Sequence, residues 1–195
     1  QNASRDIEYV VFEVKPSAED VAAANQAMID VYEEFAATDN MKAFLLANSD
    51  RTIDNHWYKA GELNTVASAV NDYVFSDNAS VSEVIANGNT FYAVRVMESA
   101  MVPEQVYVKY APANSEDVAA ALAEAEAQWI PQTPGFEDVM TAKKGTQVTV
   151  NGLVFEVLDT KDVLPMKKVA ILEKKAVASE KTKSSCYAQA NTFAT

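Results

Sequence analysis

The amino-acid sequence predicts an α+β protein built from two tandem units and the opening of a third, each with helices packed on an antiparallel sheet. The first observation is an internal repeat, because the hexapeptide Glu-Asp-Val-Ala-Ala-Ala occurs at Glu19–Ala24 and again at Glu116–Ala121. Each copy follows a β-favouring run, a proline and a serine suited to cap a helix. Two Asn-Gly hairpin signals, Asn87-Gly88 and Asn151-Gly152, complete the pattern. This spacing indicates duplicated domains rather than solenoid repeats.

The first unit is predicted over residues 1–102. Ile7–Val14 is rich in Val, Tyr and Phe and predicts a buried strand. Ser17 and Asp20 have the spacing of a capping box, and the apolar residues that follow recur at helical spacing. We expect the first strand to pair with the last strand of the unit, Phe91–Met97. Further helices are expected over Met41–Ala47 and from Leu63 to Tyr73.

The second unit is predicted over residues 103–164 and repeats this order in a shorter form. Its first strand, Val106–Tyr110, should pair with its last, Val154–Leu158. A helix is expected over Ser115–Gln128. Residues 165–195 are predicted to open a third unit, with a strand over Val169–Glu173 followed by a helix. Trp57 and Trp129 hold equivalent places in the first two units, and both are expected in a core.

Composition excludes several classes of function. A formal net charge of −12 disfavours binding to nucleic acid, which needs Lys and Arg against phosphates, and disfavours docking on an anionic membrane. No apolar run is long enough to span a bilayer. Cys186 is the only cysteine and His56 the only histidine, so no thiolate or imidazole metal site and no cofactor are predicted. His56 is interpreted as a solvated loop residue that precedes a buried Trp57.

The order of elements, together with several short motifs, resembles the parvulin domain of peptidyl-prolyl isomerases, which has an FKBP-like fold. The resemblance is strongest to foldases of the PpiD and SurA type in the bacterial envelope. Trp57–Leu63 matches the family's G-W-F-x-x-G-x-M stretch, and Phe91–Glu98 matches its G-Y-H-I-I-K-V strand. Trp129, Phe136–Val139 and Val154–Leu158 fall on the same landmarks in the second unit. The resemblance implies two degenerate parvulin-like units.

The same resemblance implies a proline-binding pocket without an intact catalyst. Active parvulins carry one histidine in the first strand and another in the last, and Tyr9 and Tyr92 stand at those positions here. Tyr9, Trp57, Phe75 and Tyr92 are the candidate substrate-binding residues. The two tyrosines either keep a role at the proline site or simply pack across adjacent strands. No residue is assigned as catalytic.

The implied protein is a segment of a periplasmic foldase, either free or tethered to the inner membrane by another part of its parent. Three functions stay open. The chain is a non-catalytic chaperone module for unfolded or proline-containing polypeptides, an active isomerase with an atypical tyrosine-containing pocket, or a structural spacer. Four methionines either line an adaptable groove for such clients or pack in cores; they are Met97, Met101, Met140 and Met166.

Overall fold

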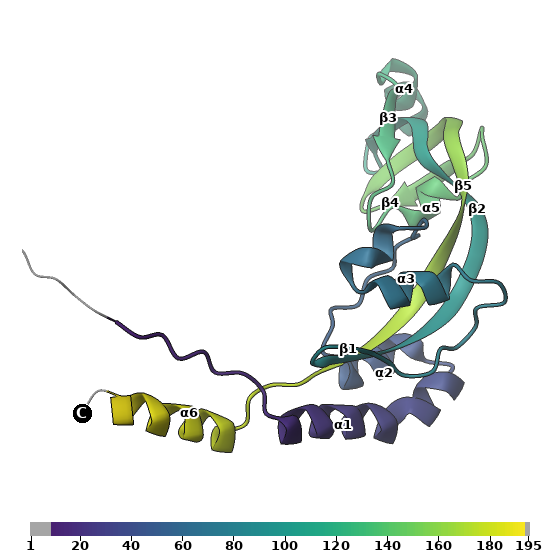
Figure 1. Cartoon of the computed structure of the whole chain (residues 1–195). Helices are drawn as coiled ribbons and strands as arrows, with labels where there is room; N and C mark the ends of the chain where they lie inside the picture. Colours follow the sequence, from purple (N-terminus) through teal and green to yellow (C-terminus); the bar gives the residue numbers. More distant parts are fainter. Residues whose placement is uncertain (1–8, 194–195) are drawn as a thin grey trace, which may run out of the picture.

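The computed structural model describes residues 9–193, and a long antiparallel ribbon organises it (Figure 1). Its two strands, β2 (Thr90–Pro112) and β5 (Leu153–Lys175), have 23 residues each and pair along their whole length. The ribbon is curved, and separate hydrophobic cores have formed at its two ends. We call these ends the lower half and the upper half, as they stand in Figure 1. The structure is therefore α+β with an open antiparallel sheet, as predicted at that level.

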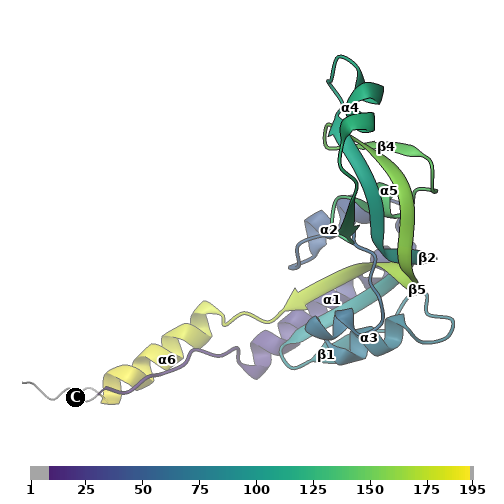
Figure 2. The same ribbon diagram turned by 90° about the horizontal axis from the view of Figure 1, so that it is seen from above.

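The lower half is a sheet covered on both faces by helices (Figures 1 and 2). Its other elements are α1 (Ala18–Ala37), α2 (Met41–Asn48), η1 (Glu62–Thr65), α3 (Ser68–Val74) and β1 (Ile85–Asn87). Neighbouring residues of a strand point to opposite faces. Ala93 and Leu172 therefore pack under α1 and α2, whereas Val94 and Ile171 pack under α3. One stretch of ribbon thus serves two cores.

The helix α1 begins at the predicted cap. The Ser17 hydroxyl accepts a hydrogen bond from the Asp20 amide at 3.2 Å, and the Asp20 carboxylate accepts one from the Ser17 amide at 2.8 Å. This reciprocal pair is a complete capping box, so that prediction is confirmed. Met28 and Phe35 are fully buried on the inner face of the helix. The hairpin between β1 and β2 is also confirmed.

The upper half adds short elements to the other end of the ribbon. They are α4 (Val118–Glu124), β3 (Gln128–Pro131), α5 (Glu137–Met140) and β4 (Gln147–Val150). β3 pairs with β2, and β4 pairs with β5. The turn between β4 and β5 places Asn151 and Gly152 at φ of 50° and 78°, the left-handed values that an Asn-Gly hairpin requires. The second predicted hairpin is therefore confirmed.

The predicted partner of Phe91–Met97 is wrong. Ile7 and Glu8 lie outside the described residues, and Tyr9–Val14 is extended without forming a strand. β5 takes that place, with Val96 opposite Val169 and Phe91 opposite Lys174. The physical reason is that β5 pairs with β2 along the whole ribbon, so its last residues lie opposite Phe91–Val96. There the side chains of β5 fill both cores of the lower half. The pairing predicted for Val106–Tyr110 is confirmed, because Tyr110 lies opposite Phe155.

The expected unit boundaries fall inside the ribbon. β2 passes residues 102 and 103 without a break, and β5 does the same at residues 164 and 165. What changes near these points is the core, since Val94 belongs to the lower half and Val102 to the upper. Val169–Glu173, expected to open a third unit, instead completes the sheet that contains β1.

The region after Ser115 also differs from its prediction. α4 is capped by Asp117, whose carboxylate accepts from the Ala120 amide at 3.0 Å, and the chain enters β3 at Gln128. Trp129 therefore lies in a strand and is 43% exposed, and its ring lies tilted against that of Tyr107 with 5.0 Å between the centroids. The expected core position of Trp129 is wrong, while that of Trp57, 3% exposed, is confirmed.

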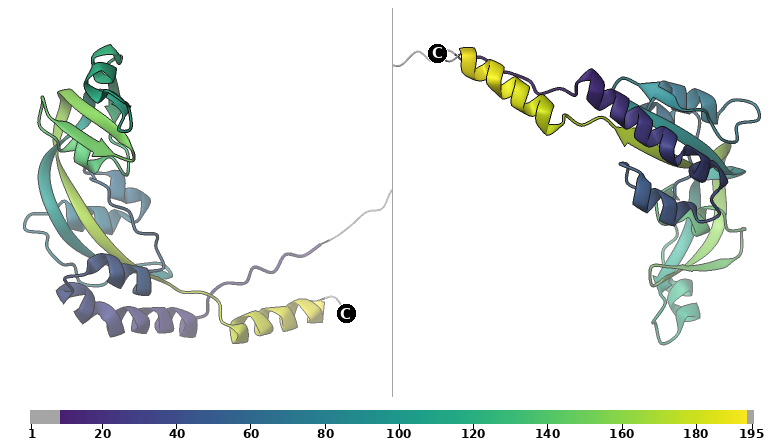
Figure 3. Two further views of the ribbon diagram at one scale, coloured as in Figure 1. Left: turned by 180° about the vertical axis from the view of Figure 1, so that it is seen from behind. Right: turned by 90° about the horizontal axis from the view of Figure 1, so that it is seen from below.

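The helix α6 (Glu180–Phe193) extends away from the sheet, alongside the chain that leads into α1 (Figure 3). A hollow between them is lined on one side by residues such as Glu13, Lys15 and Ser17 and on the other by residues of α6 such as Lys181, Ser185 and Gln189. Asp20 ties the two helices together, because it accepts hydrogen bonds from the Thr182 hydroxyl at 2.7 Å and the Ser179 amide at 3.3 Å. The Thr182 hydroxyl and the Ser17 amide hold the pKa of Asp20 well below its usual value.

Candidate functional site

The segment from Arg51 to Gly61 crosses the junction between the two halves. Within this segment, Tyr58 pairs with Lys167 of β5 through two backbone hydrogen bonds of 2.9 Å. Because the segment is extended there, successive side chains point in opposite directions. Trp57 enters the upper core and Tyr58 enters a lower core. The segment therefore fastens the middle of the ribbon to both halves.

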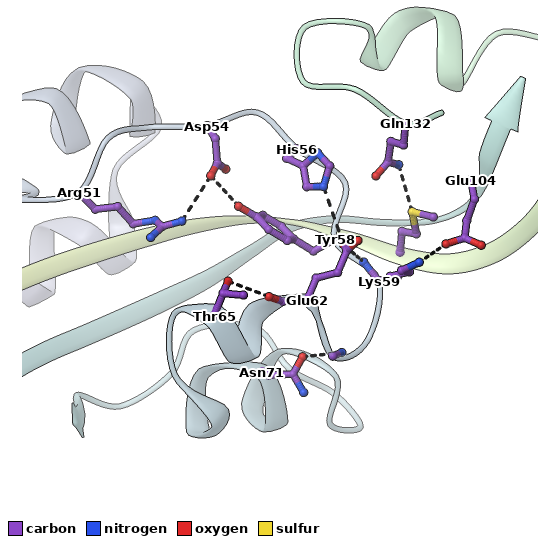
Figure 4. A network of polar contacts seen from close by, with 12 residues as sticks. Arg51, Asp54, His56, Tyr58, Lys59, Glu62, Thr65, Asn71, Glu104 and Gln132 are labelled. Atoms are coloured by element: carbon purple, nitrogen blue, oxygen red, sulfur yellow. Dashed lines mark hydrogen bonds and ion pairs between the residues drawn. The ribbon is translucent and has the colours of Figure 1, made fainter. Parts of the chain in front are cut away.

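A polar network surrounds Tyr58 (Figure 4). Its hydroxyl donates a hydrogen bond to Asp54 at 2.6 Å, and Asp54 is also 3.5 Å from the Arg51 guanidinium. Burial, followed by the hydrogen bond to Asp54, raises the pKa of Tyr58 to about 12. The His56 ring meets the Tyr58 ring edge-on, with 4.7 Å between centroids. His56 is thus largely packed, and its interpretation as a solvated loop residue is wrong in that respect.

On one side of His56 lies a small polar hollow of about 240 Å³. His56 Nε2 is 3.8 Å from Glu62, which also accepts a hydrogen bond from the Lys59 amide at 2.9 Å. Lys59 forms an ion pair with Glu104 of β2, and this partner raises the pKa of the lysine. A lysine held as a cation is a poor nucleophile. The contacts in the hollow therefore hold the two halves together and leave its lysine without nucleophilic character.

A neighbouring polar contact fixes the start of η1. The Asn71 side chain, 9% exposed on α3, accepts a hydrogen bond from the Gly61 amide at 2.8 Å (Figure 4). Gly61 has a φ of 94°, a left-handed value that favours glycine. This bond anchors the crossing segment to the lower half at the point where it turns.

On the other side of His56 lies a larger and mainly apolar groove of about 570 Å³, which we call the junction groove. Two of its apolar side chains are open to solvent, Leu46 of α2 at 71% and Met97 of β2 at 44%. Met97 lies at a register shift of the ribbon, between Val96 and Glu98, where the regular pairing of β2 with β5 is interrupted. The remaining apolar lining consists of Met41, Leu45, Ile53, Val169 and Ala170.

The rim of the junction groove carries as many lysine side chains as carboxylates. Lys42 and Lys168 stand against Asp54 and Glu98. Lys168 lies 3.5 Å from Glu98 and also 5.0 Å over the ring of Trp57, a cation–π contact. The groove therefore offers an apolar floor with a mixed polar rim, the composition of a site for apolar side chains rather than for a charged ligand.

The structure separates most of the candidate substrate-binding residues. Tyr92, 6% exposed, and Phe75 pack in the same lower core under α3. Trp57 lies in the upper core, and Tyr9 is 83% exposed at the start of the described chain. The strand neighbours of Tyr92 are Ile85 and Glu173, so Tyr9 is not beside it.

The four methionines are divided between the two interpretations. Met140 and Met166 are buried in the upper core, at 1% and 2% exposed. Met97 and Met101 are exposed on β2, and Met97 lines the junction groove. Leu46 and Ile53, which also line the groove, were not predicted from the sequence as site residues. Leu46 gave a local signal only, as a large apolar residue on the outer face of a short helix, and nothing in the sequence placed it beside Met97.

No family model, curated protein sequence or solved structure matches this chain. Among residues 9–193, no cluster of three or more His, Cys, Asp or Glu side chains is placed to hold a metal ion. The helices of this part of the chain are also too short or too polar to cross a membrane.

Proposed function

We propose that the chain is a non-catalytic polypeptide-binding module of a periplasmic, parvulin-type foldase, and that its junction groove receives apolar side chains of unfolded, proline-containing clients. The observation that carries the proposal is the groove itself, whose apolar floor stays open to solvent beside Leu46 and Met97. Its volume of about 570 Å³ suits a few side chains. Clusters of exposed apolar residues in a soluble fold commonly mark binding surfaces.

The side chains at the mouth of the groove support a site with broad specificity. Methionine is unbranched and polarizable, so Met97 can adjust to differently shaped apolar groups. Burial of one leucine- or methionine-sized client side chain contributes about 1.5–3 kcal/mol. A module of this kind would hold many sequences weakly, as a chaperone needs.

The position of Tyr92 argues against the isomerase alternative. Prolyl isomerisation has a barrier of about 18–20 kcal/mol, which a pocket lowers by binding the twisted amide better than the planar one. Tyr92 is buried under α3, and burial raises the pKa of its hydroxyl. A client proline has no access to a side chain so enclosed, and Tyr9 does not stand beside it.

One observation favours the third function, a structural spacer. The ribbon of β2 and β5 runs without a break through both halves and spans about 70 Å if its residues are fully extended. Both described ends of the chain lie at the lower half, where α6 contacts α1, so such a ribbon would hold the upper half at a fixed distance from any flanking part. A spacer, unlike a chaperone module, has no need of an open apolar groove.

The experiment is a titration of a fluorescently labelled, reduced and carboxymethylated model protein with the full chain, followed by anisotropy. We expect saturable binding, with Leu46→Asp and Met97→Asp each weakening it about tenfold or more. Ile29→Asp is the matched control, because Ile29 is also an exposed apolar residue but lies on α1, outside the groove. Absence of binding, or equal losses in all three variants, would reject the chaperone proposal and leave the spacer.

A further inference from the structure

The segment Tyr9–Val14 has the sequence of a buried strand, but its first three residues lie exposed, and Phe12 and Val14 are only half-buried. Tyr9, Val10 and Val11 are 83%, 62% and 77% exposed, and the backbone is extended. Apolar residues at consecutive positions are typical of strands that are covered on both faces. Three such residues in a row on the surface indicate that the segment is covered by something else when it functions.

The chain contains a counterpart that shows what such a segment does. Val10–Glu13 (Val-Val-Phe-Glu) resembles Ala170–Glu173 (Ala-Ile-Leu-Glu) of β5, and a basic residue and then a helix-capping serine follow each run within six residues. Ser17 caps α1, and the hydroxyl of Ser179 accepts from the Thr182 amide at 3.3 Å at the start of α6. The strand pattern and the capped helix are therefore repeated, with connections of different length.

The helices that follow the two segments, α1 and α6, begin beside each other. Asp20 in the first turn of α1 binds both Ser179 and Thr182 at the start of α6. From that point the end of β5 runs into the sheet, whereas Tyr9–Val14 runs away from it (Figure 3). The two segments have similar side-chain patterns, and they differ in that only the end of β5 is paired in the sheet.

The counterpart is bound by a β-hairpin edge. Val169–Lys175 pairs antiparallel with β2, on the side opposite β1. Ala170 and Leu172 are buried on one face of the resulting sheet and Ile171 on the other. Under the correspondence above, Val10 takes the place of Ala170, and Val11 takes the place of Ile171. A strand edge with apolar cores on both faces, such as the edge of β2 that pairs with β5, would therefore also suit Tyr9–Val14.

In this chain the hairpin of β1 and β2 has no free edge on the β2 side, because β1 pairs with one side of β2 and β5 pairs with the other. We propose that Tyr9–Val14 is a docking strand, which completes the antiparallel sheet of another polypeptide by adding to the edge of a β-hairpin that is apolar on both faces. Main-chain hydrogen bonds supply affinity in such strand addition, and alternate side chains supply specificity. This inference stands apart from the junction groove and does not depend on it.

The test uses a probe taken from the chain itself, a cyclised and fluorescently labelled peptide with the sequence Ser82–Met97. Cyclisation is needed because an isolated two-stranded hairpin is only marginally stable. The full chain is titrated into the probe, and anisotropy is measured. We expect saturable binding that Val11→Asp and Val10→Pro each weaken about tenfold or more. Proline acts by removing an amide from the added strand.

Two controls keep the outcome decisive. Ile29→Asp and Val163→Asp also place a charge at exposed apolar positions and should bind the probe as the unmodified chain does. All variants should keep the melting temperature, because the changed residues are exposed. Amide exchange of residues 10–14 should slow when the probe is added. A probe that does not bind, or that binds the Val10 and Val11 variants undiminished, would overturn the proposal.

Discussion

Trp57 and Tyr58 are consecutive in the chain, yet their side chains are buried in two different hydrophobic cores at opposite ends of the ribbon. Their backbone pairs with Lys167 in the middle of β5, so one dipeptide joins both halves to the ribbon at the same point. A substitution that disturbs either core should therefore also change the shape of the junction groove, because His56 belongs to this segment and lines the groove.

The hydroxyl of Tyr58 should stabilise the junction. Tyr58→Phe removes the hydrogen bond to Asp54, and we expect the free energy of unfolding to fall by about 1–2 kcal/mol in urea titrations at neutral pH. Tyr110→Phe is the matched control, because Tyr110 is 40% exposed and its change should have little effect. Equal losses in the two variants would contradict the role assigned to the Tyr58–Asp54 bond.

Tyr58 should also make the chain sensitive to alkali. Its pKa rises from 10.0 to about 12 on folding, so the native state favours the protonated phenol. The stabilisation is complete below pH 10 and is lost as the pH rises toward 12. Unfolding titrations should therefore show a steeper loss between these values for the unmodified chain than for Tyr58→Phe. Parallel profiles would show that the tyrosine is not the group responsible.

The strand that closes the lower sheet can be identified by truncation of side chains. Leu172 is fully buried, and Leu172→Ala should lower the free energy of unfolding by about 2–5 kcal/mol. Val11→Ala, in the segment expected from the sequence to hold that place, should change it by less than about 0.5 kcal/mol. A large effect of Val11→Ala with a small one of Leu172→Ala would place the N-terminal segment in the sheet instead.

The contact between α1 and α6 should depend on Asp20. Thr182→Val removes one hydrogen bond to that carboxylate but leaves the capping box of α1 intact, so amide exchange in α6 should quicken while α1 is unaffected. Glu19→Ala is the control, since its ion pair with Lys181 is exposed and contributes little. Slow exchange in α6 of the Thr182 variant would count against this tether.

The same contact should weaken in acid. The pKa of Asp20 is lowered on folding, so its contribution is present above the ordinary value of 3.8 and is lost as the pH falls below it. Exchange of the α6 amides, corrected for the intrinsic effect of pH, should therefore speed up below about pH 4. In Asp20→Asn this dependence should disappear.

Prolyl isomerase activity should be absent or very weak. A protease-coupled assay with a proline-containing peptide should give the uncatalysed rate, because Tyr92 is buried and Tyr9 lies away from it. Tyr92→Phe should alter the melting temperature without altering that rate. A rate comparable with that of an active parvulin, reduced by Tyr9→Phe or Tyr92→Phe, would establish the isomerase alternative.

Signals that act over a few residues predicted local structure well. Ser17 with Asp20, and Asn151 with Gly152, specify a helix start and a turn through their own hydrogen bonds and dihedral angles. Strand partners were a harder problem. Ile7–Val14 and Val169–Glu173 are both short, mainly apolar runs that favour a strand, so the local pattern could not decide which one pairs with Phe91–Val96. That choice depends on the ribbon, which forms between distant residues.

The junction groove was out of reach for a related reason. Its lining comes from α2, the segment that crosses the junction and the middle of both long strands. Leu46 and Met97 each have an ordinary local interpretation, as a helix residue and a strand residue. Only their placement side by side in the fold makes an open apolar surface, and sequence spacing carries no information about it.

The continuity of the ribbon determines which half of the chain can complete its folding first during synthesis on a ribosome. The upper half is drawn mostly from one stretch, whereas the lower sheet waits for Leu172 and its neighbours at the far end of β5. At synthesis rates of about 5–20 residues per second, the stretch from Val96 to Glu173 takes about 4–15 s. During that time Phe91 and Ala93 have no closing strand beside them, and α1 and α2 have an incomplete surface to cover. The half that begins first is therefore the half that finishes last.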